Sequence, residues 1–312
     1  MMINDVARLD AAESVFFKRQ LESIDQRLYE EIYPDNLARS LIPTISGVDQ
    51  DAPVYTWRMI KKAGEAVIVG DMADDVPRSD VSGEEQSQVI KTLAASYGWT
   101  IDEIKYASRT GTPLETWKAM AARHSIENKM DSILALGDTD TGLTGALGLS
   151  NTTTFTPSTK SGGGTAWANA TSDEIAADLF GICTAIIAAM KSSGGPQFQR
   201  FRILIPVEQY GLIAQKRMGD GSDVTILNFV KANSPYIESI NAWHRCATAG
   251  SGSTTRMMAF PPTEEVVGAL VPMEFTTLPP QQQNLTYKVI ARAKTGGVVA
   301  RYPLACAYGD GI

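Results

Sequence analysis

The stretch TPLETWKAMAARHSIENKMDSILALGDTDTGLTGALG, residues 112–148, decides the fold, because it joins a long helix to a tight glycine-rich turn. Thr112-Pro113-Leu114-Glu115 combines an N-cap threonine, a proline at the first helical position and a glutamate three residues after the cap. This pattern predicts a helix over residues 113–136. Such a helix is about 36 Å long and about twice the usual length.

The predicted helix changes its apolar side along its length. Apolar side chains of the first half share one face, and those of the second half share the roughly opposite face: Leu114, Trp117 and Ala121 against Ile126, Met130 and Ile133. We therefore expect the helix to pack against different layers at its two ends.

The turn GDTDTGLTGALG, residues 137–148, suggests three chemistries, and the sequence argues against each. A calcium loop starting at Asp138 needs an oxygen ligand and a glutamate where Gly142 and Leu149 stand. An aspartic-protease DTG motif needs a second copy and a preceding apolar strand. A phosphate cradle leads into a helix N-terminus, whereas this turn follows a helix C-terminus. We interpret the turn as a structural joint, with Gly137 as the left-handed C-cap.

Composition indicates a folded protein of one large or two ordinary domains. The chain has 312 residues, of which 44% are hydrophobic. Its net charge is −7, so a single copy gains little from releasing counterions from a nucleic acid. The longest apolar run, 180–190, is about half the length of a membrane-spanning helix. Neither a membrane segment nor an export signal is predicted.

Few residues in the sequence indicate a catalytic site or a metal site. Cys183, Cys246 and Cys306 are widely spaced and odd in number, which predicts reduced structural thiols in a cytosolic protein. A dyad of Cys246 with His244 is conceivable, but no third orienting group is identifiable. Lys160 precedes the glycines of KSGGG, residues 160–164, so this run is not a phosphate-binding loop and is interpreted as a flexible linker. No catalytic, cofactor or metal site is predicted.

The N-terminal third predicts an arm and a long hairpin. Residues 1–50 contain a charged helical stretch around 12–29 and too few apolar residues for a core of their own. Residues 51–95 contain extended runs on either side of the polar stretch 71–83, which predicts a two-stranded ribbon. Because a long isolated hairpin is marginally stable, it needs a partner surface, which could be another subunit.

The second half predicts a compact α/β unit. The low-complexity run 149–167 is interpreted as a surface loop or interdomain connection. A capping box at Thr171–Glu174 then opens an apolar helix that ends near Ser192. The segments that follow predict alternating elements: strand 200–206, helices 207–217 and 226–232, strands 236–243 and 256–260, and returning strands within 285–308.

This order of parts resembles a tailed-phage major capsid protein of the Hong Kong 97 type, over nearly the whole chain. The stretches that carry the resemblance are LESIDQRLYEEIYPDNLARSLIP (21–43), ADDVPRSDV (73–81), SYGWTIDEI (96–104), GDTDTGLTGALG (137–148) and TGGVVARYPLACAYGDGI (295–312). Together they are similar to the branch often described only as an uncharacterised phage major capsid family.

The resemblance implies an α+β chain of four parts. These are an N-terminal arm (1–50), an extended loop that overlaps a neighbouring subunit (51–95), a peripheral domain (96–170 and 271–312) and an α/β axial domain (171–270). Residues 113–136 become the spine helix of the peripheral domain. The hairpin then lacks a core because a neighbour supplies it. The loop residues expected at the subunit interface are Tyr55, Trp57, Arg58, Lys61, Lys62, Asp74, Asp75 and Arg78.

The implied function is mechanical, not enzymatic. By the resemblance, hexamers and pentamers of the chain are expected to form an icosahedral head around packaged double-stranded DNA, held without sequence-specific contacts and without a membrane. The resemblance also implies assembly in the bacterial cytoplasm with a portal protein. A separate scaffolding protein, or a chain in its mature form, is implied because no scaffolding segment precedes the arm. Lys61 or Lys62 could form an isopeptide crosslink, but no motif selects either.

Two alternatives from other classes remain open. An encapsulin-type nanocompartment shell shares the fold and encloses an enzyme in place of a genome. An enzyme built on His244 and Cys246 is the more distant alternative.

Overall fold

The structure is a computed structural model. It describes residues 36–64, 66, 68, 78–111, 114–219, 221 and 223–312. The helical stretch expected around 12–29 and the N-cap pair Thr112-Pro113 lie outside the described residues.

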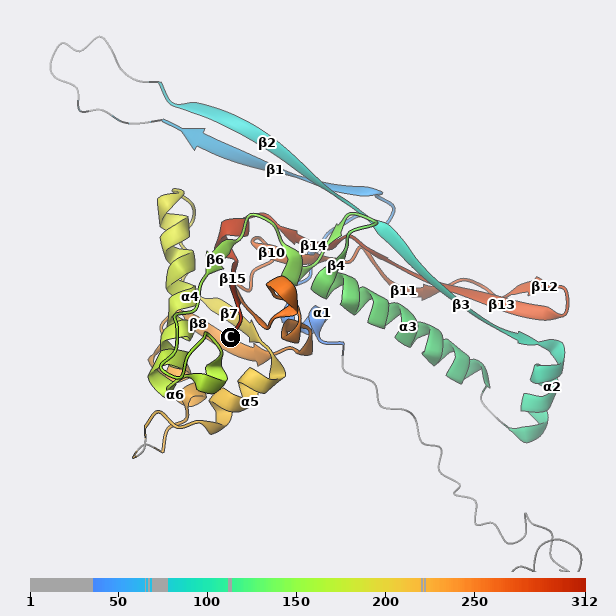
Figure 1. The fold of residues 1–312 in the computed structure, drawn as a ribbon. Helices are drawn as coiled ribbons and strands as arrows, with labels where there is room; N and C mark the ends of the chain where they lie inside the picture. The colour runs from blue at the N-terminus through green and yellow to red at the C-terminus, as the bar shows by residue number, and fades with distance from the viewer. Residues whose placement is uncertain are drawn as a thin grey trace, which may run out of the picture. The chain divides into compact units, whose positions relative to one another are not determined.

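The predicted hairpin is present as a two-stranded sheet. β1 (Val54–Ala63) runs antiparallel to β2 (Asp80–Val89), with Val54 opposite Val89 and Ala63 opposite Asp80 (Figure 1). Among the described strands neither pairs with a third, and nearly every residue of β2 is exposed. The extended run predicted after the polar stretch 71–83 is divided at Ile90, which is buried and donates its N–H to the Pro53 carbonyl at 2.9 Å.

A second sheet begins directly after this joint. β3 (Lys91–Thr100) pairs along its whole length with β13 (Thr286–Thr295), which also pairs with β11 (Met273–Thr277) and β12 (Gln281–Gln283). α2 (Ile101–Thr110) follows β3 at the far end of this sheet (Figure 1). The long helix α3 (Leu114–Leu136) packs against β3 and β13, and its bounds agree with the prediction.

The two predicted apolar faces of α3 differ in burial. Ile126, Met130 and Ile133 are buried as expected. The face of Leu114, Trp117 and Ala121 is not covered by a second layer in the described part of the chain, and Trp117 is 41% exposed. Among the described residues, packing on two layers is therefore not found for this half of the helix.

The described part of the arm packs on the rest of the subunit and has no core of its own. α1 (Ala38–Leu41) lies against α3, where the Asp131 carboxylate accepts the Ala38 N–H at 2.9 Å. Arg245 forms an ion pair with the same carboxylate at 3.2 Å. Asp131 is 2% exposed, so one buried charge of α3 holds both segments.

The glycine-rich turn is the predicted joint. β4 (Gly137–Asp138) and β5 (Leu143–Thr144) form a small hairpin at the edge of a sheet ordered β10 (Val267–Leu270), β14 (Gly297–Ala300), β5, β4. Gly137 has φ +81°, which confirms the left-handed C-cap. The backbone at Gly145 lies so close that a Cβ there would stand 2.2 Å from the Gly137 nitrogen.

Replacing Gly145 with alanine should destabilise the subunit by about 1–3 kcal/mol, because a rigid backbone atom must move to admit the methyl group. Urea unfolding of the unassembled subunit measures this. Gly211→Ala is the matched control, since a Cβ at Gly211 in α5 (Val207–Gln215) meets nothing within 4 Å. It should stabilise by up to about 1 kcal/mol. Equal effects of the two substitutions would contradict the close approach.

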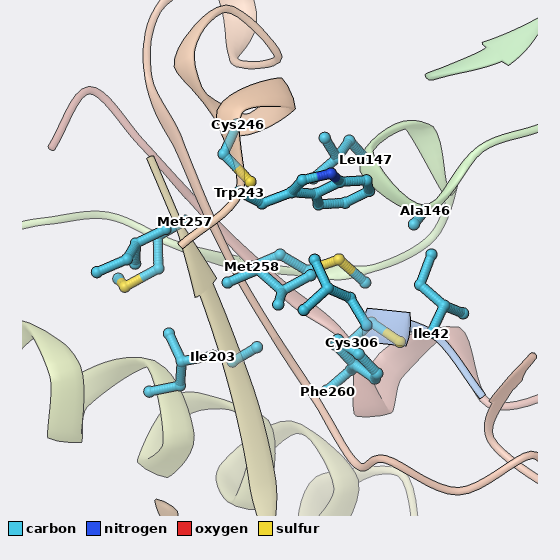
Figure 2. Close-up of a cluster of buried hydrophobic side chains, with 14 of the residues drawn as sticks. Ile42, Ala146, Leu147, Ile203, Trp243, Cys246, Met257, Met258, Phe260 and Cys306 are labelled. Carbon is cyan, nitrogen blue, oxygen red and sulfur yellow. The ribbon is translucent and has the colours of Figure 1, made fainter. Parts of the chain in front are cut away.

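The largest sheet has five strands and holds most of the core. Its order is β6 (Thr153–Phe155), β15 (Ala307–Asp310), β9 (Arg256–Phe260), β7 (Phe201–Ile205), β8 (Ile237–Ala242). α4 (Ser172–Ser192) and α6 (Ile226–Asn233) pack with this unit. Figure 2 shows Met258, Phe260 and Cys306 of this unit gathered with Ile42 of the arm and Leu147 of the joint. Short 3-10 turns complete the described chain: η3 (Ala146–Gly148), η4 (Trp167–Asn169), η5 (His244–Ala247), η6 (Ser251–Ser253) and η7 (Pro303–Ala305).

Three strands cross the predicted domain boundaries. β6 and β15 were expected in the peripheral domain, yet they pair with each other and β15 pairs with β9 of the predicted axial domain. β10 was expected in the axial domain, yet it pairs with β14 of the predicted peripheral domain. The run 149–167 is therefore not a linker: it supplies β6, and Trp167 is 1% exposed. Lys160 is buried too, because it forms an ion pair with Asp178 of α4. Interpreting 160–164 as a flexible linker was wrong for this reason.

One helix among the described residues, α4, is long and apolar enough to cross a membrane by length and composition alone. Its side chains Ile175, Leu179 and Ile182 are fully buried inside the subunit. The apolar character of α4 is thus explained by the core that it builds.

Candidate functional site

The hairpin is held at its root by aromatic side chains. Tyr55 and Trp57 stack with their ring centroids 6.0 Å apart and pack on the small buried cluster of Ile45, Ile90, Leu270 and Val299. Arg301 donates from Nη2 to the Tyr55 hydroxyl at 2.7 Å, and Gln88 donates to the Gly142 carbonyl at 3.1 Å. Two of the predicted interface residues, Tyr55 and Trp57, therefore contact their own subunit and fix where the hairpin starts.

Beyond the root, the outer face of the hairpin carries exposed aliphatic side chains among polar and charged ones. Side chains alternate between the two faces of a strand, so Ile60 and Val54 lie on the face opposite to Tyr55 and Trp57. Ile60 is 70% exposed, and the neighbouring Val81 of β2 is 61% exposed. The residue opposite Ile60 is Gly83, which has no side chain to cover it.

The predicted charged residues lie on the exposed part of the hairpin. Arg58 pairs with Glu85 at 2.6 Å and Lys61 pairs with Glu84 at 2.5 Å, both across the two strands. The hydrogen bond from Lys61 holds the pKa of the Glu84 carboxyl below its usual value. Lys62 and Arg78 are exposed, and Lys62 forms no ion pair with another described residue. Asp74 and Asp75 lie outside the described residues.

A second exposed apolar surface, which the sequence analysis missed, lies at the far end of β3. It is an open groove with a volume of ≈ 590 Å³ that runs between α2 and the start of α3. Trp99, Ile104 and Leu114 line it. The signal available in the sequence was Thr100-Ile101-Asp102-Glu103, a capping box that opens α2.

The proposed Cys246–His244 dyad has no chemical basis in the structure. Both residues lie in the short turn η5, and the Cys246 thiol is fully buried. Burial raises the pKa of Cys183, Cys246 and Cys306 to about 12, so each remains a protonated thiol near neutral pH. Among the described residues no group of three His, Cys, Asp or Glu side chains could hold a metal ion.

Alkylation of the native subunit at pH 8 should therefore leave all three thiols unmodified, and modification should follow unfolding. The same pKa shift predicts that stability is unaffected below the ordinary thiol pKa of 9.0 and falls as the pH rises above it. The sign follows because the unfolded state loses thiol protons that the folded state keeps. Mass spectrometry and urea unfolding between pH 7 and pH 10 measure the two effects, with urea-unfolded chain as the positive control for labelling. Rapid labelling of the native subunit would contradict the burial.

The sequence profile of the family described as "Major capsid protein" matches residues 64–312. The chain belongs to this family. The match begins directly after β1 and covers β2, the groove beside α2 and the rest of the chain to the C-terminus, whereas Ile60 lies before it.

Solved capsid structures share the fold of this capsid protein. The capsid of Myoviridae phage XM1 superposes with a TM-score of 0.82 at 18% identity, covering 96% of this chain and 100% of that chain. The capsid of a native GTA particle gives 0.66 at 11% identity, covering 97% and 99%. The virus-like particle from Pyrococcus furiosus gives 0.50 at 14% identity, covering 86% and 90%. No curated protein matches in sequence. The predicted α+β class and capsid fold are confirmed, and the phage capsid is better supported than the nanocompartment.

Proposed function

We propose that many copies of this capsid protein form a closed icosahedral shell of hexamers and pentamers around the packaged double-stranded DNA of a tailed phage. The observation that carries the proposal is the hairpin. Its two strands extend from the subunit with exposed aliphatic side chains and no third strand in the described chain, so it needs a neighbour. A structural role of this kind requires no catalytic group.

The predicted parts fit this shell with two amendments. β6 and β15 join the axial domain through the pairing of β15 with β9, and β10 joins the peripheral domain through its pairing with β14. The hairpin residues Arg58, Lys61, Lys62 and Arg78 are the candidates for contact with the next subunit.

The proposed partners follow from the same role. A separate scaffolding protein directs assembly in the bacterial cytoplasm, a portal protein admits the genome, and the finished protein resides in the virion. The net charge of −7 supports enclosure of DNA without tight binding, because a container that neutralised many phosphates would retard packaging and release.

Negative-stain electron microscopy of the purified chain, with and without a co-expressed scaffold, tests the proposal. Closed shells, tubes or rings of five or six subunits are expected. Only monomers or dimers under both conditions would overturn it. Nucleic acid inside native particles separates the phage capsid from the nanocompartment, for which a co-purified enzyme is expected.

A further inference from the structure

The carboxylate of Asp131 lies where three predicted parts of the subunit meet. It belongs to α3 of the predicted peripheral domain and is 2% exposed. Its Oδ1 accepts the N–H of Ala38 in the predicted arm at 2.9 Å, and its Oδ2 accepts the Nε–H of Arg245 in the predicted axial domain at 3.3 Å. These two partners are 93 and 114 residues away along the chain, so this meeting point is created by the fold alone.

Asp131 also joins two sheets of the subunit. The turn η5, which carries Arg245, packs on β7 and β9 of the five-stranded sheet. The helix α3, which carries Asp131, packs on β3 and β13 of the second sheet. The ion pair between the two side chains, with Arg245 Nη2 3.2 Å from Asp131 Oδ2, therefore bridges the two sheets.

The arm segment 38–45, here called the strap, is bonded to both of these parts of the subunit. The Leu41 carbonyl accepts a hydrogen bond from Arg202 Nη1, on β7, at 2.7 Å. The Pro43 carbonyl accepts the N–H of Ala269, on β10, at 2.7 Å. Because β10 pairs with β14 of the predicted peripheral domain, the strap connects the five-stranded sheet to the peripheral strands, and Asp131 holds its first residue.

The burial of Asp131 restricts the geometry of its contacts. A buried carboxylate is stable only where hydrogen bonds and a positive charge replace its water. Leu37, the residue before α1, makes no side-chain hydrogen bond to the helix, so the N–H of Ala38 depends on Asp131 as its acceptor. Hydrogen bonds to a charged group are short and directional, whereas apolar contacts have no preferred direction. Asp131 therefore limits how far α3, the strap and η5 can shift relative to one another.

We propose that Asp131 is a positioning residue for assembly: by holding the strap and η5 on α3, it sets the angle between the axial and peripheral parts of the subunit and thereby the curvature of the shell. The inference rests on the proposed function, since it names the residue that gives the subunit its shape in the shell. Repeated contacts between copies close only when the rotation from one copy to the next permits. An angular error inside the subunit is repeated in every copy, so it changes the diameter of the shell or prevents closure.

Asp131→Asn tests the inference, because the amide oxygen can still accept the N–H of Ala38 but carries no charge for Arg245. Shells are imaged by electron microscopy and their diameters are measured. The spread of diameters should rise about twofold or more, or tubes and open sheets should replace the shells. The matched control is Leu179→Ala, which removes apolar volume from a fully buried position on α4 and destabilises the fold while leaving both partners of Asp131 in place. It should lower the yield and keep the diameter of the unsubstituted shell.

A second variant decides the matter if Asp131→Asn does not fold. Arg245→Met removes the cation, whose side chain is 24% exposed, and leaves Asp131 in place. Hydrogen exchange of the unassembled subunit, followed by mass spectrometry of peptides that span residues 36–42, should be about tenfold faster or more at Ala38. The N–H of Ala38 is bonded to Asp131 and not to Arg245, so a role of Arg245 limited to η5 would leave this exchange unchanged. Shells of Arg245→Met should show the same spread of diameters as those of Asp131→Asn.

The outcomes separate this inference from the proposed function. Shells of unchanged diameter from Asp131→Asn and Arg245→Met would overturn the inference and leave the capsid role intact. An equal spread of diameters from Leu179→Ala would also overturn it, because the size of the shell would then follow the stability of the subunit alone. Failure of the unsubstituted chain to assemble at all would count against the capsid role itself.

Discussion

Removing either partner of the Lys160–Asp178 ion pair should destabilise the unassembled subunit by about 3–5 kcal/mol. The Lys160 ammonium lies 2.5 Å from Asp178 Oδ2, and the two side chains are 0% and 3% exposed. Trp167 donates its indole N–H to the same oxygen at 2.8 Å. A single substitution leaves one charge buried without its partner, and water cannot reach it to compensate.

The test uses Lys160→Met and Asp178→Leu, singly and together, followed by urea unfolding. The double variant should recover most of the loss, because replacing a buried ion pair with apolar side chains of similar volume is often neutral or stabilising. The matched control is Arg58→Met, which breaks an exposed pair whose side chains are 80% and 61% exposed and should cost under about 1 kcal/mol. Single variants that match this control would show that the Lys160 charge is solvated.

The same pair shows where sequence reasoning fails. A lysine followed by serine and three glycines has the composition of a linker, and the partner that fixes it is 18 residues away on α4. No local pattern encodes that partner. The burial of Lys160 follows from tertiary packing alone.

Local signals succeeded where the determinant lay within a few residues. The bounds of α3 and α4 were predicted closely, since α4 begins with a complete capping box at Thr171 and Glu174 and α3 ends at Gly137 in the left-handed conformation. α2 has the same capping signal at Thr100 and Glu103 and was overlooked. The capping box that begins α2 is present in the sequence, so this helix could have been predicted.

Local sequence signals could not predict which distant strands pair with each other. β3 pairs with β13, so Lys91 stands opposite Thr295, and nothing near either residue specifies the other. At the candidate site the hairpin itself was predicted from its extended pattern. The role of Tyr55 at its root was not, because its partner Arg301 is 246 residues away.

Excising the outer hairpin should abolish shell formation while leaving the subunit folded. In this variant the two residues Asn-Gly replace residues 58–85 and join Trp57 to Gln86, which stand directly opposite each other in the ribbon. Asn-Gly is suited to a tight two-residue hairpin turn. The variant keeps Tyr55 and Trp57 against their buried cluster, so the free energy of unfolding should change by less than about 2 kcal/mol. Electron microscopy should show no closed shells.

The argument depends on separating folding from assembly, so both are measured on the same preparation. Near-ultraviolet circular dichroism and thermal unfolding report the subunit core, which the excised residues do not enter. A full-length chain carrying Ser82→Ala is the matched control, because it changes an exposed hairpin side chain outside the proposed contacts without shortening the ribbon, and it should still assemble. Shells of normal size from the excised chain would show that the hairpin is dispensable for contact. An unfolded excised chain would show instead that the ribbon stabilises its own subunit, which its exposed strands argue against.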